Sequence, residues 1–98
     1  MVKITGFEKD INEFSEWLTA SARISKKAAK DCISRCRRVQ KELKIDLADA
    51  VSNEVAYQLL IKEVKGITFT YADLRAACRK YADFKVPAKS KHYKKFIR

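Results

Sequence analysis

Residues that interrupt helices are scarce in this sequence. The chain has two glycines and one proline in 98 residues, and its apolar positions recur with a period near 3.6. Strand-like alternation is confined to residues 67–70, and no second segment is available to pair with it. We therefore expect an all-α protein in which residues 66–70 form a loop with a buried Phe69.

Long apolar runs are missing as well. No segment approaches the roughly 20 apolar residues that a membrane span needs, and the first residues, "MVKITGFEKD", lack the apolar core of a signal peptide. Three cysteines, an odd number without a secretory signal, indicate reduced thiols rather than a disulfide framework. We expect a soluble, cytoplasmic protein that makes no membrane contact.

Side chains that carry out catalysis are few. The sequence has one histidine, no glycine-rich phosphate loop, no nucleophile arranged with a histidine and no dense carboxylate cluster, so we expect no enzyme activity and no cofactor. A zinc ion could take Cys32, Cys36, Cys78 and His92 as ligands. The spacing is not a usual zinc signature, and Cys32 and Cys36 fall on an apolar stripe where thiols serve as small buried hydrophobes. We therefore expect no metal.

Positive charge is what the chain has in excess. Its 22 Lys and Arg residues against 12 Asp and Glu give a net charge of +10, whereas a hydrophobic content of 47% excludes a disordered polycation. A chain of this length has room for one modest core. The charge predicts an anionic partner, which could be nucleic acid, an acidic membrane surface or an acidic protein.

Four helices are predicted from apolar periodicity and capping residues, with a loop or single helical turn near residues 45–51. They cover residues 7–20 with a capping box from Thr5 to Glu8, 26–43 with Ser25 as N-cap, about 53–65 with Ser52 as N-cap and Gly66 as a stop, and a fourth from about Thr70. Their inward positions predict a core of Phe14, Leu18, Ile33, Cys36, Val39, Leu43, Leu59, Leu60, Leu74, Cys78 and Tyr81.

A basic tail follows these helices. Pro87 breaks the helical pattern, and "AKSKHYKKFIR" after it has five basic residues and no acid. The sequence thus predicts a helical domain at residues 1–86 and a basic linker or flexible arm at residues 87–98.

Basic residues are also segregated within the helical part. Helix 7–20 and residues 46–63 hold eight of the twelve acids, whereas the second and fourth helices and the tail are positive. On the second helix the cations point away from the apolar stripe, a pattern typical of nucleic-acid binding. The predicted DNA contacts are Lys26, Lys27, Lys30, Ser34, Arg37, Arg38, Lys41, Arg75, Arg79, Lys80, Lys89 and Lys91.

A family resemblance rests on the order of "FSEWL", "ISKKAAKDCISRCRRVQKEL", an acidic turn, a third helix and "TYADLRAACRKYADF". Over roughly residues 7–86 this order resembles the N-terminal core-binding domain of tyrosine recombinases of the phage-integrase type. The matching features are an aromatic–leucine pair in the first helix, a basic helix that begins at a serine and a final helix that ends in aromatic residues. They correspond to Trp17 with Leu18, Ser25 through Leu43, and Tyr81 with Phe84.

The resemblance implies an orthogonal four-helix bundle of the sterile-alpha-motif-like type that clamps one side of duplex DNA. In that family the second and fourth helices lie toward DNA, and the Arg, His-x-x-Arg and Tyr of the chemistry belong to a following catalytic domain. Here His92 is followed by Tyr93 and two lysines, so we expect no DNA cleavage or joining. The chain is either a recombinase domain, with a catalytic domain or recombinase protomers as partners, or a free-standing small protein. We expect a monomer in isolation.

Two other classes of protein stay open. A small basic helical protein could bind an acidic protein partner or inhibit a nucleic-acid complex. An exposed apolar patch would favour this alternative, and Trp17 and Tyr57 are the residues to inspect for one. Binding to a membrane surface is disfavoured, because the apolar face of the second helix holds Cys and Ala rather than Trp, Phe and Leu.

Overall fold

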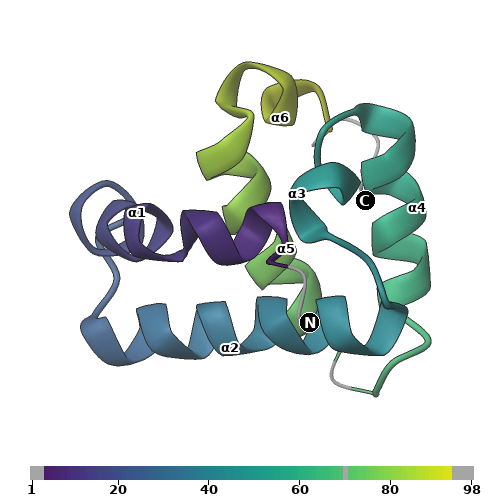
Figure 1. Ribbon diagram of the computed structural model, residues 1–98, viewed down its shortest axis with the longest axis horizontal. Helices are drawn as coiled ribbons and strands as arrows, with labels where there is room; N and C mark the ends of the chain where they lie inside the picture. Colours follow the sequence, from purple (N-terminus) through teal and green to yellow (C-terminus); the bar gives the residue numbers. More distant parts are fainter. Residues whose placement is uncertain (1–3, 70, 94–98) are drawn as a thin grey trace.

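Helices account for all the regular structure in the part of the chain that the computed structural model describes, residues 4–69 and 71–93 (Figure 1). This confirms the all-α prediction, with two short helices added to the four expected. None of the helices in the described ranges combines the length and apolar content needed to cross a membrane. The elements are α1 (Gly6–Ala20), α2 (Lys26–Leu43), α3 (Leu47–Ala50), α4 (Glu54–Val64), α5 (Tyr71–Lys85) and α6 (Pro87–Tyr93).

The most extensive contact between two helices of the fold is the one between α2 and α5. Helix α2 packs against α1 on one side and against α5 on another, while α5 also touches α1, α4 and α6. Figure 1 shows α1 lying alongside α2, with α5 crossing behind them. In the same view, α3 and α4 lie near the C-terminal end of α2. One face of α2 is thereby buried, and its other face is left open to solvent.

The core is largely the predicted one. Nine of the eleven predicted residues are buried, and Leu43 is half-buried against them. Leu59 is the exception and the prediction was wrong there, because its side chain is 55% exposed. The inward face of α4 is formed instead by Tyr57, Leu60, Ile61 and Val64. The core also includes Phe7, Leu47, Val51 and Tyr93.

Aromatic rings fill the space between α1 and α5. The Phe14 ring centroid lies 5.2 Å from that of Tyr81, 5.2 Å from that of Phe84 and 6.2 Å from that of Trp17. Phe7 completes the cluster at 4.9 Å from Tyr81 with its ring edge-on. Such pairs add about 0.5–1.5 kcal/mol each beyond area burial. Phe14 is therefore the centre of the α1–α5 contact.

Helix caps follow the predicted residues with one shift. The hydroxyls of Thr5 and Ser25 accept N–H bonds of 3.1 Å at the starts of α1 and α2. At α4 the cap is Asn53, whose side chain accepts from Ala56 N–H at 2.9 Å. Ser52 does not cap α4, because its hydroxyl donates to a carbonyl of the preceding turn at 2.6 Å.

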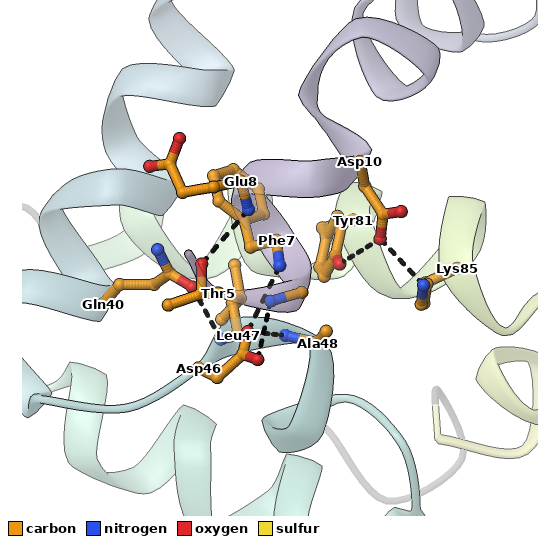
Figure 2. Close-up of polar contacts among 11 residues, drawn as sticks. Thr5, Phe7, Glu8, Asp10, Gln40, Asp46, Leu47, Ala48, Tyr81 and Lys85 are labelled. Carbon is orange, nitrogen blue, oxygen red and sulfur yellow. Dashed lines mark hydrogen bonds and ion pairs between the residues drawn. The ribbon is translucent and has the colours of Figure 1, made fainter. Parts of the chain in front are cut away.

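One carboxylate joins the starts of α1 and α3 (Figure 2). Asp46 accepts from the N–H groups of Gly6 at 2.8 Å, Phe7 at 3.2 Å and Ala48 at 3.1 Å. The first two donors are in α1 and the third is in α3. A Cβ at Gly6 would lie 2.8 Å from the Ala48 Cβ, so only glycine permits this approach. Negative charge at two helix N-termini is also favourable to both helix dipoles.

The loop before α5 differs from the prediction. Phe69 is fully exposed rather than buried. Its neighbours Ile67 and Tyr71 pack against the core instead. The loop is as short as predicted, but Phe69 turns outward between Ile67 and Tyr71, which both turn inward.

The described part of the tail is helical and packed. Pro87 begins α6, which its fixed φ and missing N–H allow at a first helical position. The Tyr93 ring stacks on Tyr57 at 5.0 Å, and its hydroxyl donates to the Val51 carbonyl at 3.0 Å. Residues 87–93 thus belong to the helical body, whereas the sequence predicted a linker or arm from residue 87 on. The remaining tail residues, 94–98, lie outside the described residues.

Candidate nucleic-acid interface

The exposed side of α2 carries most of the predicted contacts. Ser25 caps the helix, and Ala29, Cys32, Ile33, Cys36 and Val39 bury its opposite side. At about 100° per residue, seven exposed side chains share one sector that contains no acid. We call them the cationic stripe: Lys26, Lys27, Lys30, Ser34, Arg37, Arg38 and Lys41.

Charge on the rest of α2 is mixed. Asp31, Arg35 and Glu42 are exposed and lie, by the same helical geometry, on the flank toward α5. Arg35 lines a groove with α5 residues, which fixes that direction. The two acids of the helix border this edge of the cationic stripe, Asp31 four residues after Lys27 and Glu42 four residues after Arg38.

Arg37 is the member of the cationic stripe that already has an acidic partner. Its Nε and Nη2 donate to the two carboxylate oxygens of Glu8 at 3.3 and 3.4 Å, which ties α2 to the first turn of α1. The Arg37 side chain is still 55% exposed. An exposed pair of this kind is worth about 0–1 kcal/mol, so a phosphate could compete for the guanidinium.

The predicted contacts on α5 do not extend the cationic stripe. The Arg75 guanidinium lies over the Tyr71 ring, 5.5 Å from its centroid. Arg79 is turned toward α4, where burial raises the pKa of Tyr57 to about 12 and the Arg79 guanidinium partly offsets that rise. The buried Arg79 Nε has no hydrogen-bond partner within the described residues. Both side chains are only partly exposed.

Lys80 lies on the other flank of α5. It lines the groove between α2 and α5 together with Arg35, a cation that the sequence analysis did not select. Arg35 comes three residues after Cys32, and residues three apart share a helix face. This spacing was the signal from which the sequence could have identified Arg35. Arg35 and Lys80 thus form a second, smaller cationic pair next to α2.

The two tail lysines lie on α6, away from α2 in the chain fold (Figure 1). Lys89 donates from Nζ to the Ser52 carbonyl at 3.2 Å, and Lys91 is exposed. Because α6 packs on α4 and α5, these lysines belong to a different part of the surface from the cationic stripe. The structure therefore divides the twelve predicted contacts into a continuous set on α2 and smaller groups on α5 and α6.

A surface hollow of about 620 Å³ borders the C-terminal end of the cationic stripe. It combines the cations Arg37, Lys41 and Lys44 with the carboxylates of Asp46 and Asp49. Lys44 is the C-cap of α2 in a left-handed conformation, with φ of 55°. Since the lining has both signs of charge, the hollow is not a site for a simple anion.

The three cysteines meet where α2 packs on α5. All three are free and buried. Among the residues that the structure describes, no three His, Cys, Asp or Glu side chains are placed to hold a metal ion. The His92 side chain lies outside the described residues.

Comparison of the chain with protein-family models, with curated proteins and with solved structures gave no match.

Proposed function

We propose that this chain binds duplex DNA through the cationic stripe of α2, with phosphates as the main contacts. The observation that supports it is a run of six exposed cations on one side of a helix whose other side is buried. From Lys27 to Lys41 the stripe is about 21 Å long at 1.5 Å per residue. That length matches several phosphates, which repeat at about 3.4 Å along each strand.

The resemblance to the core-binding domain of tyrosine recombinases favours duplex DNA over other polyanions. In that family such a domain supplies half of a clamp, and its fold is an orthogonal four-helix bundle. We propose the same role here, with α2 lying toward DNA and the chemistry left to a catalytic partner. Half of a clamp should bind with little sequence preference, at a Kd of about 10⁻⁴ to 10⁻⁶ M at physiological salt.

A titration of the protein with random duplex DNA, single-stranded DNA and RNA at two salt concentrations tests this proposal. With about five phosphates engaged, log K for the duplex should fall with log salt at a slope of roughly −4 to −5. An affinity that did not change with salt would contradict phosphate binding. Preference for one short site by more than about a thousandfold would instead indicate a self-sufficient, sequence-specific DNA-binding protein.

Protein binding is the second candidate function, and exposed apolar side chains on α4 favour it. Val55 is 78% exposed and Leu59 is 55% exposed, one helical turn apart. Leu59 also lines a shallow groove of about 340 Å³ between α3 and α4, whose apolar lining includes Ile45, Ala56 and Leu60. Trp17 and Tyr57, the residues that the sequence suggested for such a patch, are half-buried and buried respectively.

The double variant Val55→Ser with Leu59→Ser separates the two candidates. If DNA binds α2, this variant should keep the duplex affinity and salt slope of the original chain, because neither side chain lies on α2. The measurement is the same titration. Loss of duplex binding in this variant, with an unchanged circular-dichroism spectrum, would show that the α4 patch rather than the cationic stripe makes the contact.

A further inference from the structure

The loop between α4 and α5 borders a surface hollow of about 440 Å³. Its lining, which we call the aromatic loop, consists of Lys65, Gly66, Ile67, Thr68, Phe69 and Tyr71. The Phe69 side chain is fully exposed, so a ligand that covered its ring would gain the free energy of removing apolar surface from water. The aromatic loop is therefore a candidate site for a ligand with an apolar face.

The aromatic loop is fixed to the helical body before and after Phe69. The N–H groups of Gly66 and Ile67 donate to the carbonyls of the last two residues of α4 at 3.0 and 3.1 Å. Tyr71 is the first residue of α5, and Ile67 and Tyr71 both pack against the core. The exposed ring thus stands on a segment that is anchored on either side of it.

The charges around the aromatic loop favour an anionic ligand. Lys65 lines the hollow, and the Arg75 guanidinium lies over the Tyr71 ring, 5.5 Å from its centroid. The neighbouring acids line other parts of the surface: Glu63 the groove between α3 and α4, and Asp73 the groove between α2 and α5. None of the described residues that line the hollow itself is acidic. The site thus suits a ligand that combines a planar, apolar face with negative charge.

We propose that the aromatic loop binds an unpaired nucleobase, which stacks on the Phe69 ring. A nucleotide has both required features, because every base has a π-face that stacks on aromatic side chains and is joined to a phosphate. This inference rests on the proposed function and adds a class of substrate to it. The preferred ligand is duplex DNA with a single-stranded segment beside it, rather than a blunt duplex.

One nucleic acid can reach both the cationic stripe and the aromatic loop. Helix α2 contacts α4 and α5, the two helices that the aromatic loop connects. The longest axis of the molecule is 36 Å. A single strand of ten nucleotides spans at least about 34 Å, at no less than the 3.4 Å per nucleotide of a duplex strand. An overhang of about this length on a duplex bound at α2 is therefore long enough for the test.

Three DNAs that share one duplex sequence test the site: a blunt duplex, the duplex with a ten-thymidine overhang, and the duplex with an abasic overhang that has as many phosphates. We expect the thymidine overhang to bind about 5- to 150-fold more tightly than the abasic one, the usual effect of a stacked base. Phe69→Ala should abolish this difference, and Phe69→Trp should retain it because an indole also stacks on bases. A circular-dichroism spectrum of each variant verifies that it is folded.

The blunt duplex separates this inference from the proposed function. It offers no single-stranded base, so the original chain and Phe69→Ala should bind it with the same affinity and salt slope, and Lys65 is not engaged. Salt-dependent binding of the blunt duplex, without a preference for thymidine over abasic overhangs, would overturn the inference alone. A preference that survived in Phe69→Ala would do the same. Binding to none of the three DNAs would overturn both.

Sedimentation of the free protein tests the other possible occupant of the aromatic loop, a second copy of the chain. We expect the original chain and Phe69→Ala to sediment alike. A dimer that Phe69→Ala converted to a monomer, with no change in affinity for any of the three DNAs, would assign the exposed ring to contact between copies and overturn the inference.

Discussion

Replacing Lys27, Lys30 and Arg38 together by glutamine is expected to remove most of the salt dependence of duplex DNA binding. These three members of the cationic stripe are exposed, and the triple variant leaves the Arg37–Glu8 pair intact. With about five phosphates engaged, the original chain should lose roughly 500-fold in affinity between about 50 and 200 mM salt. With about two left, the variant should lose only about 12-fold.

The control removes the same number of charges elsewhere. Lys9→Gln with Lys62→Gln and Lys65→Gln takes three exposed lysines from α1, α4 and the end of α4, so both variants have the same net charge. If the cationic stripe is the DNA contact, this control variant keeps the steep dependence of log K on log salt. Equal slopes in the two triple variants would mean that net charge, rather than the stripe on α2, determines binding.

Phe14→Ala should destabilise the fold by about 3–5 kcal/mol, the usual cost of removing a buried ring. Phe14 is fully buried and contacts Tyr81, Phe84 and Trp17 as well as Phe7. Domains of this kind are stable by only about 5–15 kcal/mol, so the loss is a large share of the total. Urea unfolding followed by circular dichroism measures this loss of stability as a lower urea concentration at the midpoint of unfolding.

Phe69→Ala is the matched control for that ring removal. The substitution is chemically the same, but Phe69 is fully exposed in the loop between α4 and α5. This substitution should change the free energy of unfolding by no more than about 0.5 kcal/mol, as most surface substitutions do. A similar loss of stability in both variants would contradict the description of Phe14 as the centre of the α1–α5 contact.

Local signals in the sequence were sufficient for α1 and α2. Thr5 and Ser25 are capping residues followed by regular apolar spacing; α2 begins at the predicted residue and α1 begins one residue earlier than predicted. The same reasoning failed at Leu59, because α4 has apolar residues on more than one face and only its neighbours decide which face is buried. It missed the packing of α6 for a similar reason: the burial of Tyr93 depends on Tyr57, far away in sequence.

The candidate interface, like the fold, could be predicted from the sequence only in part. The cationic stripe follows from the periodicity of one helix. The surroundings of Arg79 and Lys80 do not, since these adjacent residues of α5 face different partners, Tyr57 on α4 and the groove beside Cys32. Which flank of α5 is covered by α4 and which by α2 is a property of the tertiary structure.

The carboxylate of Asp46 has a consequence for the order in which the chain assembles. Its bond to Gly6 spans 40 residues, so the start of α1 acquires this cap only after a long loop has closed. The cap of α2 is local, from Ser25 to Ala28 three residues later, and needs no such closure. We therefore expect α2 to become helical early, and the first turn of α1 to be fixed late, after the chain has passed through α2 and returned at α3.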